Sequence, residues 1–402
     1  MSLWKTITRK EDPRVYENKD GHLVRSLKVR DFLALGVGTI VSASIFTLPG
    51  EVAAMHTGPA VAISFVVAAI VAGLVAFAYA EMAAAMPFAG SAYSWINVVF
   101  GEFFGWIAGW ALLAEYFIAL AFVGAGLSAN LRALLAPAGI KLPVSLSNAF
   151  GTEGGVVDTI SVVVIALVAI LIANGASKAA RVETLLVCLK VFAILLFVVV
   201  GMSAIKSSNY VPFIPKYHET ANGPFGGWQG IYAGVSMIFL SYIGFDSIAA
   251  NSAEAINPQK TMPRGILGSL LIAVVLFVSV AMVLMGVLPY SKYANNAEPV
   301  GLALRAAGHG GVAVVVQAIA VVGMFTALIG MSLAGSRLIY SFGRDGMLPK
   351  WLGKLDKSGR PNRALWTLTI VTIVIAAFFP FAFLSQLVSA GTLIAFMFVS
   401  LG

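Results

Sequence analysis

The chain is poor in charged residues and in cysteine. Only 11% of its 402 residues are charged, less than half of the roughly 25% that is usual in a soluble domain. Its single cysteine, Cys188, excludes an intramolecular disulfide framework and a cysteine-clustered metal site. The four histidines are scattered singly and have no metal-ligand spacing. The sequence therefore predicts no bound metal.

Motifs for enzymatic chemistry are also missing. The sequence contains no P-loop or other nucleotide motif, which argues against direct ATP drive. Neither Cys188 nor the serines have a histidine at a plausible depth that would activate a nucleophile. We therefore expect neither an enzyme nor a resident cofactor.

Apolar residues dominate the composition. They make up 59% of the chain, and the mean hydropathy is +0.91. A water-soluble globule of this size would be left with large exposed apolar patches, so we expect the lipid bilayer as a partner. A membrane about 30 Å thick needs about 20 apolar residues per helix. Ten stretches fit, at 32–55, 60–86, 102–130, 156–174, 182–205, 230–255, 264–289, 311–341, 364–383 and 385–402.

The basic residues predict the orientation of these ten helices. Nineteen Lys and Arg residues fall on one side of the predicted membrane and six on the other, and Lys190 lies inside a span. Because cytoplasmic loops carry the excess of Lys and Arg, we expect a multi-pass protein of the cell membrane with its N-terminus in the cytoplasm. The net charge of +8 is explained in this way, without a nucleic acid partner. The first thirty residues are polar and do not resemble a cleaved signal peptide.

Two segments of the sequence indicate an internal repeat. Residues 41–59 and 240–258 align at an offset of 199 residues, and the second lies five helices after the first, so the second copy is inverted. Chance recurrence of small residues in apolar helices is the alternative. The predicted domains are a cytoplasmic segment 1–30, a first repeat 31–205, an extracellular loop 206–229 and a second repeat 230–402. The matched pairs are Ser42 and Ser241, Phe46 and Phe245, Ala54 and Ala253, and Pro59 and Pro258.

Both segments carry residues that interrupt a helix. A run of small polar residues lies in the first span, and Gly244 and Asp246 lie in the middle of the sixth. Interrupted helices at this depth line a cavity or are buried in protein. The N–H groups of one half-helix attract a carboxylate, and the free carbonyls of another attract an ammonium, which suits a zwitterionic amino acid. We expect the substrate-binding residues to be Ile40, Ser42, Ala43, Ser44, Ile45, Leu240, Ser241, Ile243 and Asp246.

Several short motifs, taken together in order, resemble the amino acid–polyamine–organocation (APC) transporters, and in particular the bacterial relatives of the cationic amino acid transporters. The resemblance implies an all-α membrane protein with a LeuT-type core of five plus five inverted helices, in which the first and sixth are broken. The family's Gly-(Ser/Thr)-Gly is here Ser42-Ala43-Ser44. Ten transmembrane helices are expected, the usual last two being missing. The motifs lie at 36–46, 79–81, 86–87, 90–93, 241–246, 257–259, 336–337 and 343–346.

Two carboxylates inside spans are candidates for function, because a charge is costly there. Asp246 either contacts a substrate amine or the outer gate, or it hydrogen-bonds to neighbouring backbone and holds the break open. For Glu115 the resemblance implies a role in proton coupling or side-chain selection, and the alternative is a structural hydrogen bond. In related transporters an aromatic side chain closes over the substrate, which makes Phe239 or Leu240 the gate.

Lys190 lies well inside the fifth span. The resemblance implies that a lysine here replaces the sodium ion of sodium-coupled members, because its ammonium can face carbonyls of the broken first helix. Snorkelling to the interface or a fixed backbone pairing is the alternative. We therefore expect proton-coupled symport of amino acids, with the proton as the coupling ion. The other hypotheses are an exchanger without ion coupling and a transport-inactive sensor or truncated remnant. The oligomeric state stays open.

Overall fold

The computed structural model describes residues 10, 12–14, 23, 25–42, 44–135, 139, 142–150, 154–220, 223–294, 296, 298–379, 384 and 390–402. Helices account for most of their regular structure. The first half contains α3 (Val29–Ile40), α4 (Ser44–Val52), η1 (Ala53–Thr57), η2 (Gly58–Ala60), α5 (Val61–Ala85), α6 (Ala92–Val99), α7 (Glu102–Leu135), α8 (Val144–Ser147), α9 (Thr159–Ala173), α10 (Ala176–Met202) and η4 (Ser207–Tyr210). The second half contains β1 (His218–Thr220), β2 (Gly223–Phe225), α11 (Gly227–Phe239), η5 (Leu240–Tyr242), α12 (Phe245–Ala250), η6 (Ser252–Glu254), α13 (Pro258–Val287), η7 (Tyr290–Tyr293), α14 (Pro299–Ala306), α15 (Gly310–Asp345), α16 (Asn362–Phe378) and α18 (Ala390–Leu401).

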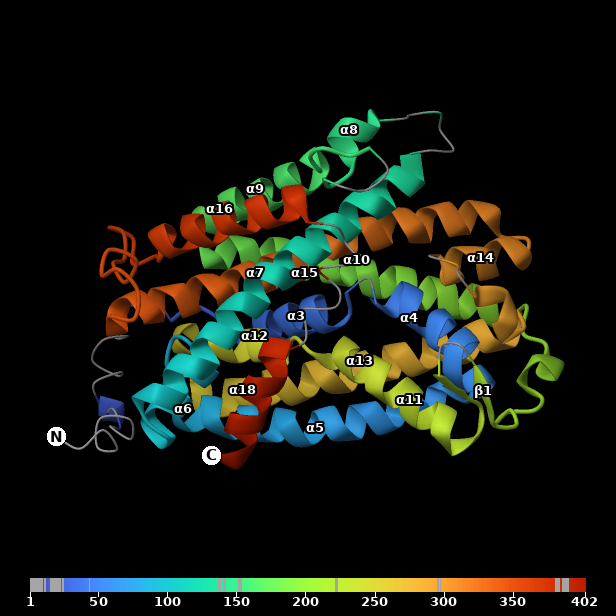
Figure 1. Ribbon diagram of the computed structural model, residues 1–402, viewed down its shortest axis with the longest axis horizontal. Helices are drawn as coiled ribbons and strands as arrows, with labels where there is room; N and C mark the ends of the chain where they lie inside the picture. Colours follow the sequence, from blue (N-terminus) through green and yellow to red (C-terminus); the bar gives the residue numbers. More distant parts are fainter. Residues whose placement is uncertain are drawn as a thin grey trace.

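The long helices run lengthwise through the molecule and lie beside one another (Figure 1). α13 packs against both α5 and α3, and α15 packs against α7 and α10. Strands β1 and β2 form a small antiparallel hairpin in which His218 pairs with Phe225. The hairpin lies at the end of the bundle opposite to that where α3 begins (Figure 1).

Five segments are long and apolar enough to cross a membrane, which confirms the prediction of a multi-pass membrane protein. They are Ser44–Ala85, Glu102–Arg132, Lys178–Met202, Pro258–Val287 and Gly310–Asp345. Two shorter apolar helices are Thr159–Ala173 and Asn362–Phe378. Each of the ten predicted stretches overlaps helix in the structure, although the count of ten spans stays a prediction.

Apolar stripes on the outside of the bundle show where lipid would lie. On α5, Ile70, Leu74 and Phe77 recur at helical spacing and are 61%, 68% and 60% exposed. On α10, Leu185, Phe192 and Val199 form a similar stripe, seven residues apart. Such exposed apolar faces are unfavourable in water but match hydrocarbon.

Two helices are interrupted. α3 gives way to α4 after Ile40, and α11 gives way to α12 after Phe239. The two pairs run in opposite directions along the bundle (Figure 1). Pro59 and Pro258, which the repeat aligns, lie respectively just before α5 and at the first position of α13, the helices that follow the two interrupted pairs. The inverted repeat itself stays a prediction.

Helix starts differ from the predicted spans where charged residues occupy the first turns. α10 begins at Ala176 rather than at 182, after Gly175 adopts φ of +124°. α13 begins at Pro258 rather than at 264, and its first two turns hold Lys260 and Arg264. A hydropathy window finds the apolar part of such a helix and not its polar start.

Candidate functional site

The first interruption lies in the middle of the molecule. Ile40 and Ile45 are buried, and Ser42 and Ser44 are half-buried with their hydroxyl oxygens 3.4 Å apart. The backbone N–H of Ser42 donates to the carbonyl of Ile40, 2.9 Å away. The first-turn N–H groups of a helix have no carbonyl partner within it, so those of α4, beginning at Ser44, are suited to an anion. Ala43 lies outside the described residues.

The second interruption contacts the first. After η5 the chain turns at Gly244, whose φ of +135° is rarely adopted by other residues. A Cβ on Gly244 would lie 3.1 Å from Cβ of Thr39 and 3.2 Å from the nitrogen of Ile40. The Thr39 hydroxyl lies 3.1 Å from the carbonyl oxygen of Gly244 and 2.8 Å from that of Leu35. Two breaks far apart in sequence thus meet at one place.

The remaining predicted contacts of the second break are distributed around it. Ser241 is buried and its hydroxyl donates to the carbonyl of Ile238 at 2.7 Å, where α11 ends. Ile243 is half-buried beside the turn. The backbone of Leu240 begins η5, whereas its side chain lies outside the described part of the structure. The ring of Phe239 meets Phe396 of α18 edge-on, with centroids 6.4 Å apart.

Asp246 lies on the other side of the second break, in the first turn of α12. It is buried, and the Tyr116 hydroxyl of α7 donates to its Oδ2 at 2.8 Å. Beside this pair is a cavity of about 10 Å³, lined also by Tyr79 and Ser91, a size that holds about one water. Glu115, next to Tyr116 in α7, is buried as well. The structure therefore brings Asp246 and Glu115 into one buried polar region with two tyrosines.

Lys190 is completely buried in α10 and does not reach the interface. Its Nζ donates to the carbonyl oxygen of Gly38 in α3 at 3.0 Å and to the Thr326 hydroxyl in α15 at 2.7 Å. Thr326 in turn lies 2.9 Å from the same Gly38 oxygen. The ammonium thus joins three helices two residues before α3 ends at Ile40, a placement that fits both the coupling hypothesis and the fixed backbone pairing.

Glu183 is a buried charged residue that the sequence analysis missed. Glu183 has no exposed surface, and neither carboxylate oxygen accepts a hydrogen bond from any described residue. It precedes Lys190 by seven residues on α10, so the two share a helix face. This spacing is the signal that could have identified it.

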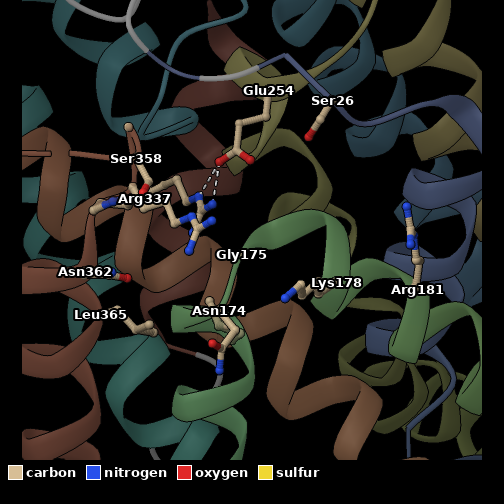
Figure 2. A pocket seen from close by; sticks show the side chains of 14 residues that line it. Ser26, Asn174, Gly175, Lys178, Arg181, Glu254, Arg337, Ser358, Asn362 and Leu365 are labelled. Atoms are coloured by element: carbon tan, nitrogen blue, oxygen red, sulfur yellow. Dashed lines mark hydrogen bonds and ion pairs between the residues drawn. The ribbon is translucent and has the colours of Figure 1, made fainter. Parts of the chain in front are cut away.

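A basic pocket opens at the end of the bundle where α3 and α10 begin, which we call the basic end. The cavity is about 340 Å³ and is lined by Lys178, Arg181, Arg337 and Arg360, with Glu254 as its acidic residue. Figure 2 shows Arg337 and Glu254 paired across it, with the Arg337 Nε 2.7 Å from a Glu254 oxygen. Both side chains are buried. This ion pair ties α15 to η6, just beyond α12.

Backbone contacts also join two segments at the basic end. The N–H groups of Ser26 and Leu27 both lie 3.0 Å from the carbonyl oxygen of Glu254. The chain before α3 is therefore held against the segment that follows the second interrupted helix. Within the described residues, no group of three His, Cys, Asp or Glu side chains is placed to hold a metal ion.

Comparison with known proteins identifies the family. Residues 27–402 match the amino acid permease family. The chain is 65% identical to a branched-chain amino acid permease, BcaP, of Lactococcus lactis subsp. cremoris, over 98% of this chain and 84% of that protein. It is 36% identical to a methylthioribose transporter of Bacillus subtilis, over 96% and 82% of the two chains. It is 33% identical to the vacuolar cationic amino acid transporter 4 of Arabidopsis thaliana, over 98% and 66%. The chain belongs to the amino acid permease family, within the APC transporters that its motifs resemble, and is a transporter rather than an enzyme.

Proposed function

We propose that this permease is a secondary active transporter that carries branched-chain amino acids across the cytoplasmic membrane together with a proton. The observation that carries the proposal is the contact between the two interruptions at Gly244 and Thr39. Two broken helices that meet in the middle of a membrane bundle offer unpaired N–H and carbonyl groups to one ligand.

The ends of the half-helices match the two charges of an α-amino acid. We assign the α-carboxylate to the backbone of Ser42 to Ile45, where α4 begins, and the α-amine to carbonyls near Ile40, Leu240 and Ser241. Opposite polarity at the two breaks supports this assignment. The apolar residues Ile40, Ile45 and Ile243 beside the breaks suit an aliphatic side chain. So does the 65% identity to a permease named for branched-chain substrates.

The proton is assigned to Lys190. Its ammonium holds α3 through Gly38 at the point where a sodium ion would otherwise be needed, and loss of the proton would weaken this hold. We do not assign the coupled proton to Glu115 or Asp246. They support the coupling at Lys190, since Tyr116 already donates a hydrogen bond to one carboxylate oxygen of Asp246. Phe239 is the gate in this proposal, moving away from Phe396 when substrate enters.

The orientation follows from the charge distribution. We place the basic end, with its pocket and the Arg337–Glu254 ion pair, in the cytoplasm, because basic residues favour that side. The ion pair and the backbone contacts of Ser26 and Leu27 then close the cytoplasmic route. A LeuT-type repeat of five plus five helices accounts for the opposite directions of the two broken pairs.

Transport by purified protein in liposomes tests the proposal. Radiolabelled leucine, isoleucine, valine and lysine are each added outside the liposomes, with the outside more acidic than the inside and with sodium present or absent. We expect accumulation of the three branched-chain amino acids, dependent on the gradient and indifferent to sodium. Uptake only into liposomes preloaded with amino acid would support an exchanger instead. Stabilisation by leucine without any flux would support a sensor, and either result contradicts symport.

A further inference from the structure

Glu183 is an unexplained charge in the interior of the bundle. Its side chain is completely buried, and both carboxylate oxygens are without a hydrogen-bond partner among the described residues. A carboxylate in such a place is strongly disfavoured unless it carries a proton or gains a partner. The proposed function assigns no role to Glu183.

The position of Glu183 is made possible by a glycine. A Cβ built on Gly38 of α3 would lie within 3.2 Å of the Glu183 carboxyl carbon, and closer still to Oε1. The missing side chain leaves the space that the carboxylate fills. Gly38 is also the residue whose carbonyl accepts from Lys190. Glu183 and Lys190 therefore converge on one residue of α3, next to the first interruption.

The groups that face Glu183 are few. α3 presents Gly38, and α15 presents Thr326, whose Cβ lies 3.2 Å from the same built Cβ; neither residue titrates. Lys190, seven residues further along the same helix, is the charged side chain that also reaches Gly38. Glu183 and Lys190 are thus an acid and a base that both reach Gly38 without contacting each other directly.

We propose that Glu183 is a second proton-binding residue, which takes the coupled proton from Lys190 and passes it to the basic end. The inference rests on the proposed function. Glu183 lies seven residues closer to that end, about 10 Å along the helix axis. The basic pocket reaches Arg181 of the same helix turn, so water from the pocket gains access to Glu183 when α3 moves aside.

The transfer balances in protons and charge. An N–H bond of the Lys190 ammonium breaks and an O–H bond forms on the Glu183 carboxylate, through a bridging water, because the two side chains do not contact each other directly. The products are a neutral amine and a neutral acid. The acid then releases its proton to water at the basic end, and the amine takes a new proton from the opposite side. One proton has crossed the membrane for each cycle.

Glu183→Gln tests the proposal, because glutamine has the shape of the protonated acid but releases no proton. We compare wild type, Glu183→Gln and Lys190→Met in liposomes, by leucine accumulation under a pH gradient and by counterflow of leucine between leucine-loaded liposomes and medium. Glu81→Gln, which changes an exposed glutamate on α5, is the matched control. For a gradient of one pH unit we expect accumulation to fall from about tenfold to about onefold in Glu183→Gln, with counterflow retained.

A second measurement separates proton transfer from a structural role. Glu183→Asp restores a titratable group on a shorter side chain, so we expect it to recover gradient-driven accumulation with a changed dependence on external pH. If Glu183→Gln accumulates leucine at the wild-type level while Lys190→Met does not, Glu183 is structural and the inference is wrong, but the proposed function stands. If wild type itself ignores the pH gradient, the proposed function fails.

Discussion

Replacing Lys190 by methionine is the most direct test of how the permease is coupled. Methionine has a similar length and no charge, so it fills the same space in α10. It removes the two hydrogen bonds from Nζ to the Gly38 carbonyl and the Thr326 hydroxyl. Each such bond from a charged group contributes about 1.5–3 kcal/mol.

The same substitution also removes the cost of burying an ammonium, which is several kcal/mol. The Gly38 oxygen keeps a partner, because Thr326 Oγ1 lies 2.9 Å from it. The two changes oppose each other, and Glu183, which makes no hydrogen bond to Lys190, is accommodated in its protonated form, so we expect the stability to change by no more than about 2 kcal/mol. The protein should therefore fold, bind leucine and exchange it.

Coupling should be lost completely. One pH unit across the membrane is worth about 1.4 kcal/mol per proton, a tenfold accumulation of substrate. Without a proton carrier the ratio of internal to external leucine should approach one. The assay is uptake into liposomes at a fixed pH gradient, with thermal unfolding in detergent as the measure of folding. Tenfold accumulation by a folded Lys190→Met protein would refute the reasoning.

Three further predictions follow from the geometry of the two breaks and the basic end. Ser42→Leu places a bulky side chain beside the predicted carboxylate site, so leucine binding measured by scintillation proximity should be abolished in a protein that still folds; unchanged affinity would remove the assignment. Gly244→Ala forces alanine to φ of +135° against Thr39, and should destabilise the protein by about 1–3 kcal/mol, seen as earlier thermal unfolding; an unchanged transition would mean that the turn relaxes freely. Arg337→Met leaves Glu254 buried and unpaired and should cost about 3–5 kcal/mol, with partial recovery in the double variant that also carries Glu254→Met; no recovery would show that the pair is not the cause.

The sequence located both interruptions but not their contact. Small polar residues at 42–44 and the glycine at 244 predict where the helices end, because these residues favour local backbone irregularity. The structure ends α3 at Ile40 and begins α12 at Phe245 accordingly. The hydrogen bond between Thr39 and Gly244 joins residues 205 positions apart, and such a contact depends on how whole helices pack. No local pattern encodes it.

Lys190 and Glu183, on one helix, differ in the same way: the sequence identified the first as a candidate and missed the second. Lys190 stood out because apolar residues surround it on both sides. Glu183 fell at the edge of the predicted span that began at 182, where charged residues are ordinarily solvated. The structure extends α10 back to Ala176, which places Glu183 two turns inside the helix. An error of six residues in one boundary therefore concealed a buried carboxylate.

The burial of this pair also depends on glycines in the neighbouring helices. Gly38 leaves room for the Glu183 carboxylate, and a Cβ on Gly323 of α15 would lie 2.8 Å from Cδ of Lys190. The opposite side of α10 presents Leu185 and other large apolar residues outward. A helix in water would be arranged the other way, with its charges outside. Inside a membrane protein, burying the charged side chains of Glu183 and Lys190 costs free energy, and apolar side chains would pack there without that cost. Gly38 and Gly323 lie where they leave space for these two side chains. Such an arrangement is expected where the charge serves transport, and under the proposed function coupling depends on the Glu183–Lys190 face of α10.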